Sequence, residues 1–137
     1  MIRPELLSRV MKHEGFESKP YKDTTGHLTI GYGRNLDDVG ITEAEAAELL
    51  ENDLLNARVQ CFAMFAVFFA DLSQNRQDVL IEMMFNLGWR KLKGFQKMRL
   101  ALERRNYEMA ADEMLNSLWA KQVGQRAETL ADLMRKG

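Results

Sequence analysis

Two carboxylates and a hydroxyl lie within a short stretch near the start of the chain, at Glu14, Asp23 and Thr29. The first is expected to end a helix, the second to lie in a turn, and the third to follow on a strand. Hydrolysis of a glycosidic bond needs such a set, because one acid protonates the leaving oxygen while a second carboxylate supports the attack on the sugar carbon. Ordinary solvated acids are the alternative interpretation, since this combination occurs by chance in many soluble chains.

Glycines and alternating apolar residues surround this set. Glycine supplies unusual backbone angles and room for close approach, so a strand that carries Gly-Tyr-Gly can expose its backbone amides to a large ligand. The alternation of apolar side chains predicts a β-hairpin between about residues 16 and 36. The glycines are Gly15, Gly26, Gly31 and Gly33, and the alternating residues are Leu28, Ile30 and Tyr32.

The segment before Glu14 has a helical pattern. Apolar residues recur at helical spacing over residues 4–13, Pro4 suits the first turn, and Gly15 suits the end. Glu14 is therefore expected at the carbonyl end of a helix, where the helix dipole disfavours an ionised carboxylate. A general acid must hold its proton, so this position is compatible with that role.

The rest of the chain is predicted to be mainly helical. Thr42 and Glu45 form a capping box for a long helix to about residue 60, with Leu49, Leu50, Leu54 and Ala57 facing inward. Ser73 can cap a helix that ends at Gly88. Further helices are expected around residues 98–102, over 107–118 and over 127–134. The nine methionines are interpreted as packing residues. Together these features predict an α+β fold.

Composition indicates one globular domain, or two small lobes sharing a core. The chain has 137 residues, of which 46% are apolar and 28% charged. Two histidines, one cysteine and scattered acids give no metal-ligand spacing, and we expect no cofactor. There is no Ser-His-acid grouping with local support and no phosphate-binding loop, which leaves carboxylate chemistry.

Two further segments allow alternative interpretations. The apolar run from Cys61 to Ala70 is expected to be helical core, and membrane contact is the less favoured alternative. Residues 1–72 have a net charge of −5 and residues 73–137 a net charge of +4. Seven cations lie between Arg90 and Arg105, either as a solvated helix face or as a surface for an anionic polymer. No zinc spacing or aromatic RNA-binding signature supports a nucleic-acid partner.

The motif resembles that of the phage-type lysozymes, the family of the T-even phage endolysins (glycoside hydrolase family twenty-four). That family has a glutamate, eight residues, an aspartate, five residues and a threonine, which this chain matches at Glu14, Asp23 and Thr29. The flanking Tyr-Lys-Asp and Thr-Ile-Gly-Tyr-Gly are also in place. The similarity continues through residues 41–46, 84–88 and 94–95 and from Trp119 to Arg126.

The resemblance implies a role for each matched residue. Glu14 would be the general acid, Asp23 would orient an attacking water, and Thr29 would hold the same water. Members with this pattern invert the sugar, and their carboxyl groups lie roughly 6.5–9.5 Å apart. The implied substrate-binding residues are Tyr32, Asn86, Trp119, Gln122 and Arg126, of which Arg126 matches an arginine that pairs with the acid. Trp119 as plain core is the alternative.

The resemblance also implies the domain organisation of residues 1–137. A sheet lobe over about 15–40 would be joined by a bridging helix over about 42–60 to a helical lobe formed by 1–14 and 61–137. Three departures stand out. Arg34 replaces the histidine that follows Gly-x-Gly in T-even members, so a histidine ion pair there is lost. The loop Asn35–Gly40 is short, which should make the sheet lobe smaller, and the acidic first half of the chain is unusual for an enzyme that acts on an anionic wall.

The functional expectation is an endolysin that hydrolyses the β-1,4 bond between N-acetylmuramic acid and N-acetylglucosamine in peptidoglycan. A catalytically weak peptidoglycan-binding protein and a lytic transglycosylase are the alternatives. The beginning of the chain lacks the apolar run of a signal peptide, so we expect synthesis in the bacterial host cytoplasm and action on peptidoglycan in the periplasm. The expected partners are glycan strands and a separate holin, and the protein is expected to be a monomer.

Overall fold

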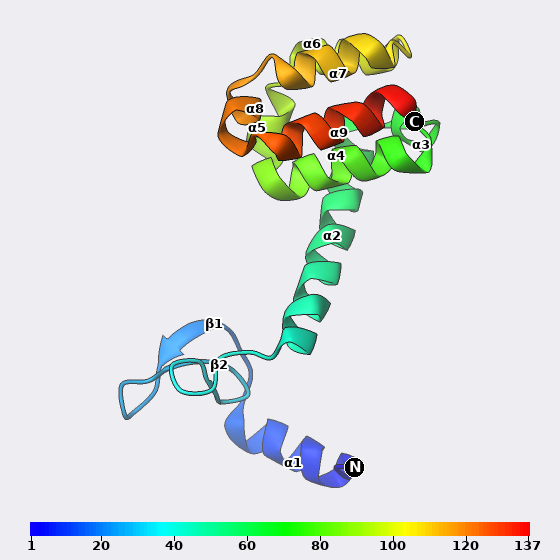
Figure 1. The fold of residues 1–137 in the computed structure, drawn as a ribbon. Coiled ribbons are helices and arrows are strands. Elements are labelled where there is room, and N and C mark those ends of the chain that lie inside the picture. The colour runs from blue at the N-terminus through cyan, green and yellow to red at the C-terminus, as the bar shows by residue number, and fades with distance from the viewer. The chain divides into compact units, whose positions relative to one another are not determined.

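The computed structural model describes residues 1–137 and contains nine α-helices and a three-stranded antiparallel sheet (Figure 1). This confirms the predicted α+β class. The chain divides into two compact units, Met1–Glu48 and Leu49–Gly137, which are described separately below. The assignment of residues 1–14 to a helical lobe stays a prediction.

Unit 1 begins with helix α1, Pro4–Glu14, as the sequence predicts. Pro4 occupies the first turn, where its missing N–H is no loss. Gly15 ends the helix in the left-handed region at φ 72°, and its N–H donates to the Met11 carbonyl at 2.9 Å. Glu14 is therefore the last helical residue.

Three strands form the sheet of unit 1 in the order β1-β2-β3: β1 Glu17–Lys22, β2 Leu28–Gly31 and β3 Arg34–Asn35. The loop between β1 and β2 is closed by main-chain bonds from Asp23 N to His27 O at 2.9 Å and from Gly26 N to Asp23 O at 3.0 Å. Gly26 has φ 83°, which a three-residue hairpin loop favours at this position. The hairpin thus fixes Asp23 at the end of β1.

Helix α2, Glu43–Phe65, starts at the predicted capping box. Thr42 N donates to Glu45 Oε1 at 2.8 Å, and Glu45 N donates to Thr42 Oγ1 at 3.1 Å. The helix runs five residues beyond the predicted end near 60. The expectation that Leu49 and Leu50 face inward is wrong, because they are 54% and 45% exposed. The buried side of α2 begins only at Ala57.

Unit 2 consists of residues 49–65 of α2 and seven further helices. Helix α9 packs against α4 and α7, and α7 packs against α6 (Figure 1). The predicted helix over 107–118 is wrong at its end: the helix stops at Leu115, and a separate helix starts at Leu118 after the Ser117 cap. The helices are α3 Val67–Ala70, α4 Gln74–Leu87, α5 Trp89–Lys93, α6 Gln96–Glu103, α7 Tyr107–Leu115, α8 Leu118–Val123 and α9 Gln125–Lys136.

The core of unit 2 is rich in sulfur and aromatic rings, as the methionine-rich sequence predicts. Six of the nine methionines are buried, whereas Met1, Met11 and Met109 are exposed. The buried ones are Met64, Met83, Met84, Met98, Met114 and Met134. Methionine fills irregular gaps because its chain is unbranched and polarizable, which suits a core of short helices that meet at several angles.

The apolar run at residues 61–70 contributes to this core, which confirms the favoured interpretation. Cys61, Phe65 and Phe69 are buried, and Phe69 packs edge-on against Phe62 at 4.7 Å between ring centroids. Burial raises the pKa of the Cys61 thiol to about 12, so the side chain stays protonated. None of the helices combines the length and apolarity needed to cross a membrane.

Candidate functional site

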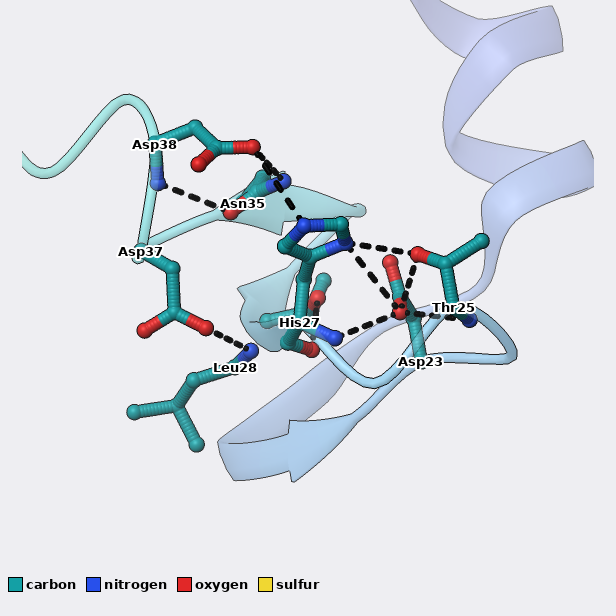
Figure 2. Close-up of polar contacts among 8 residues, drawn as sticks. Asp23, Thr25, His27, Leu28, Asn35, Asp37 and Asp38 are labelled. Carbon is teal, nitrogen blue, oxygen red and sulfur yellow. Dashed lines mark hydrogen bonds and ion pairs between the residues drawn. The ribbon is translucent and has the colours of Figure 1, made fainter.

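Asp23 is held by one of its two carboxylate oxygens (Figure 2). Its Oδ1 accepts hydrogen bonds from Thr25 N at 2.9 Å, Thr25 Oγ1 at 2.8 Å and His27 N at 2.9 Å. Asp side chains commonly accept from the backbone two residues on, which explains why Asp23 fits this loop. The other oxygen, Oδ2, makes no hydrogen bond within the chain and is free to accept one from water or substrate.

These hydrogen bonds also set the charge of Asp23. The His27 N–H and the Thr25 hydroxyl together hold the pKa of the Asp23 carboxyl below its usual range. The side chain is 32% exposed, so the carboxylate remains in contact with solvent. Asp23 is therefore an ionised, oriented carboxylate near neutral pH.

Thr29 lies two residues beyond His27 on β2 and is only 3% exposed. Its hydroxyl donates to the His27 carbonyl oxygen at 3.0 Å, the same oxygen that accepts from Asp23 N. Asp23 and Thr29 are thus joined through the backbone of one residue. A hydroxyl that donates its only hydrogen can still accept one, so Thr29 can receive a hydrogen bond from a water.

Glu14 is exposed at the end of α1 and close to the loop that follows β2. A Cβ atom built on Gly33 would lie 3.1 Å from Oε2 of Glu14. Gly33 also has φ 87°, so a side chain there would meet both strain and the carboxylate. Glycine at this position lets the Glu14 carboxylate lie directly against the backbone.

Tyr32, also in unit 1, is exposed on the loop between β2 and β3. Its ring lies 5.5 Å from that of Phe16, centroid to centroid, in a tilted arrangement. Each exposed ring offers an apolar face, and Tyr32 adds a phenolic group at its edge, which suits contact with a sugar ring.

The replacement of histidine by Arg34 creates a different ion pair. Arg34 Nη1 and Nη2 donate to the two carboxylate oxygens of Glu45 at 2.9 and 2.7 Å, and Nη1 also donates to Gly40 O at 3.0 Å. A bidentate pair of this kind is geometrically specific. The arginine therefore ties β3 to the first turn of α2 across the short loop.

Unit 2 contains the remaining predicted site residues. Trp119 is 4% exposed, stacks edge-on with Phe95 at 6.2 Å, and donates its indole N–H to Asn86 Oδ1 at 2.7 Å. The ring therefore belongs to the core, and its polar edge orients the exposed Asn86 amide. Gln122 is exposed on α8.

Arg126 pairs with Glu82 on the surface of unit 2, with Nε 2.8 Å from Oε2. Both residues line a groove of about 500 Å³ whose apolar walls are Leu50, Leu54, Ile81 and Phe85. The partner of Arg126 within this unit is thus Glu82. The pairing with Glu14 that the family resemblance implies stays a prediction.

The basic segment between residues 90 and 105 is mostly exposed on α5 and α6. Arg99 lies 3.5 Å from Glu103, and Arg105 lies 3.9 Å from Asp71, so part of its charge is paired. Lys91 and Lys97 line a hollow of about 450 Å³ that Glu113 also lines. The mixed lining is compatible with the solvated-face interpretation and leaves the anionic-polymer interpretation open.

Three polar neighbours of the predicted site were not expected from the sequence: Thr25, His27 and Glu82. The first two have a local signal, because residues two and four positions after an Asp in a turn commonly bond to its side chain. The sequence gives no such local signal for Glu82, because its partner Arg126 is 44 residues away.

A small antiparallel sheet, a long helix and a helical unit make up the α+β architecture of a lysozyme-like protein. The comparison with protein families agrees: the phage lysozyme model matches residues 11–136, and the chain belongs to that family. An endolysin of Salmonella phage P22 is 32% identical over 84% of this chain and 80% of its own length. A probable T4-type lysozyme of Dictyostelium discoideum is 26% identical over 96% of this chain and 94% of its own.

Proposed function

We propose that this protein is a muramidase that cuts the β-1,4 bond between N-acetylmuramic acid and N-acetylglucosamine in peptidoglycan. Membership of the phage lysozyme family supports a peptidoglycan-lytic role for this protein and a glycosidase activity. The observation that carries the finer proposal is the state of Asp23, whose Oδ1 is bonded three times while Oδ2 is free. A water-orienting carboxylate needs one fixed oxygen and one available oxygen.

In this mechanism Glu14 is the general acid, which protonates the glycosidic oxygen as the bond breaks. Asp23 accepts a hydrogen from the attacking water and supports the oxocarbenium-like transition state. Thr29 accepts the other hydrogen of that water, which leaves a lone pair directed at the sugar carbon. Attack from the face opposite the leaving group inverts the anomeric carbon.

The proposed contacts with the glycan use exposed side chains. Tyr32 offers a ring face, and Asn86, Gln122 and Arg126 offer amide or guanidinium donors. Trp119 acts through Asn86, because its indole N–H bonds to the amide oxygen at 2.7 Å and leaves the amide nitrogen available as a donor.

The test compares four charge-neutralising variants in a peptidoglycan-clearing assay on cells stripped of their outer membrane. Glu14→Gln and Asp23→Asn should each abolish most clearing while thermal unfolding stays close to that of the wild type. Glu17→Gln and Asp53→Asn are matched controls, because both residues are exposed and form no salt bridge in the structure. Clearing near the wild-type rate by a folded Glu14→Gln protein would refute the proposal.

Analysis of the products separates hydrolysis from the transglycosylase alternative. A lytic transglycosylase needs one acid and no positioned water, and leaves a 1,6-anhydro end. A hydrolase leaves a reducing end, and an inverting one releases it first as the α-anomer. Mass spectrometry of digested glycan strands and NMR of the fresh product therefore test the reaction class and its stereochemistry.

Delivery to the wall is proposed to depend on a separate holin, with the enzyme synthesised in the host cytoplasm and acting as a monomer. Expression of the protein alone in a Gram-negative host should give lysis only after the membrane is permeabilised chemically. Prompt lysis without permeabilisation would contradict this part of the proposal, and sedimentation of the purified protein would test the monomer.

A further inference from the structure

The side chains of Thr25 and His27 form a short hydrogen-bonded chain to the candidate base (Figure 2). Thr25 Oγ1 lies 2.8 Å from Asp23 Oδ1 and 2.6 Å from His27 Nδ1. The imidazole Nδ1 itself is 3.9 Å from Asp23 Oδ1, too far for a direct hydrogen bond. The threonine hydroxyl therefore connects the two groups.

The direction of this chain follows from counting hydrogens. The hydroxyl has one hydrogen, and an ionised carboxylate has none to give. If the hydroxyl donated to His27, its oxygen and Asp23 Oδ1 would face each other at 2.8 Å with lone pairs only, which is repulsive. The hydroxyl must therefore donate to Asp23, and His27 Nδ1 must carry a hydrogen and donate to Thr25.

The far side of the imidazole faces Asp38. Its Nε2 lies 3.6 Å from Asp38 Oδ2, beyond the range of a direct hydrogen bond. Asp38 is fixed in turn by Asn35, whose Nδ2 donates to Asp38 Oδ2 at 3.0 Å and whose Oδ1 accepts from Asp38 N at 3.0 Å. The ring thus lies between the hairpin loop and the turn after β3.

We propose that Thr25 and His27 are positioning residues that fix the orientation of the Asp23 carboxylate, so that Oδ2 alone faces the attacking water. The inference rests on the proposed function, because it takes Asp23 as the water-orienting group. Thr25 and His27 do not contact the substrate in this scheme. They act through Asp23 Oδ1, which receives the third of its hydrogen bonds from the Thr25 hydroxyl.

Variants at the two positions separate this role from a structural one. Thr25→Val removes the hydroxyl and keeps the shape. His27→Asn places an amide nitrogen near the Nδ1 position, whereas His27→Gln reaches toward Nε2 and loses the donor to Thr25. Thr24→Val is the matched control, since the neighbouring Thr24 is exposed and its side chain makes no hydrogen bond in the structure.

We expect Thr25→Val to lower kcat on labelled glycan fragments by about tenfold, because a hydrogen bond to a charged group is lost. His27→Gln should also lower kcat, because the Thr25 hydroxyl loses the donor that directs its hydrogen toward Asp23. KM should stay within about twofold, since neither side chain binds substrate. Thr25→Ser, His27→Asn and Thr24→Val should match the wild type. Carbon-13 NMR should show the pKa of Asp23 rising in Thr25→Val, because one of the hydrogen bonds that lower it is gone.

The outcomes distinguish this inference from the proposed function. An inactive Asp23→Asn protein together with a fully active Thr25→Val protein would overturn the positioning role alone. An active Asp23→Asn protein would overturn the proposed function and this inference with it. Equal losses in His27→Asn and His27→Gln would also overturn the inference, because the position of the donor would then not matter.

Discussion

Replacement of Thr29 by valine tests whether its buried hydroxyl serves the reaction or only the hairpin. Valine keeps the branched shape of threonine and removes the hydroxyl. The hydroxyl now donates to His27 O at 3.0 Å, a neutral hydrogen bond worth about 0.5–1.5 kcal/mol net. The His27 carbonyl keeps its bond from Asp23 N at 2.9 Å, so no acceptor is left without a partner. The expected loss of stability is therefore at the low end, about 0.5–1 kcal/mol.

Serine at position 29 gives the matched comparison. It retains the hydroxyl and removes one buried methyl group, which costs about 0.8 kcal/mol. The two variants should thus unfold at similar denaturant concentrations. If Thr29 positions the attacking water, Thr29→Val should lose at least about tenfold in kcat, a barrier increase of roughly 1.4 kcal/mol. Thr29→Ser should stay close to the wild-type rate.

The assay is steady-state hydrolysis of labelled glycan fragments at saturating substrate, with urea unfolding measured on the same preparations. A Thr29→Val protein that is folded and as fast as Thr29→Ser would refute the water-positioning role. Its hydroxyl would then be a structural element of the hairpin. Loss of rate in both variants would equally contradict the prediction, because the hydroxyl would not be the deciding group.

Three other predictions concern stability and reactivity. Asn86→Leu should cost about 1–3 kcal/mol in urea unfolding, because the buried indole N–H of Trp119 loses its acceptor; an unchanged midpoint would contradict the inferred pairing. Cys61 should react with a disulfide reagent at pH 8 only on unfolding, since it is fully buried and its thiol stays protonated with a pKa of about 12; rapid labelling of the native protein would show that the site opens. Hydrogen bonds from Arg34, and next from Thr42, lower the pKa of Glu45 from 4.5 to about 2, so its contribution to stability should be present above about pH 4.5 and disappear as the pH falls through about 2. Acid titration of unfolding for wild type and Glu45→Gln measures this, and curves that stay parallel to below pH 2 would contradict it.

The sequence predicts the elements of unit 1 because their determinants are local. Pro4 and Gly15 set the ends of α1, and the capping box of Thr42 and Glu45 starts α2. The turn at Asp23 follows from an aspartate and a glycine three residues apart. Each of these signals lies within four residues of the helix end or turn that it marks, so no knowledge of the tertiary fold is needed to find it.

The predictions from sequence fail where a helix end or the burial of a side chain depends on backbone conformation or on contacts with distant residues. The predicted end of α2 is five residues too early, because no Gly or Pro marks Phe65 and the helix stops where Ala66 adopts φ 52°. Leu49 and Leu50 follow the helical pattern of a buried face, yet unit 2 buries α2 only from Ala57 on. Periodicity gives the face of a helix but not the length over which that face is covered.

The same distinction between local and distant determinants applies to the residues of the candidate site. The hydrogen bonds to Asp23 come from residues two and four positions away, so the orientation of this carboxylate is a property of the hairpin itself. The contacts of Asn86 and Arg126 span 33 and 44 residues and depend on the packing of α4 with later helices. A variant that loosens the core of unit 2 should therefore disturb the presentation of Asn86 and Arg126 first, while the carboxylate of Asp23 keeps its three donors. Loss of activity in such a variant would be a loss of binding or of folded protein, and not of the proton-transfer geometry at Asp23.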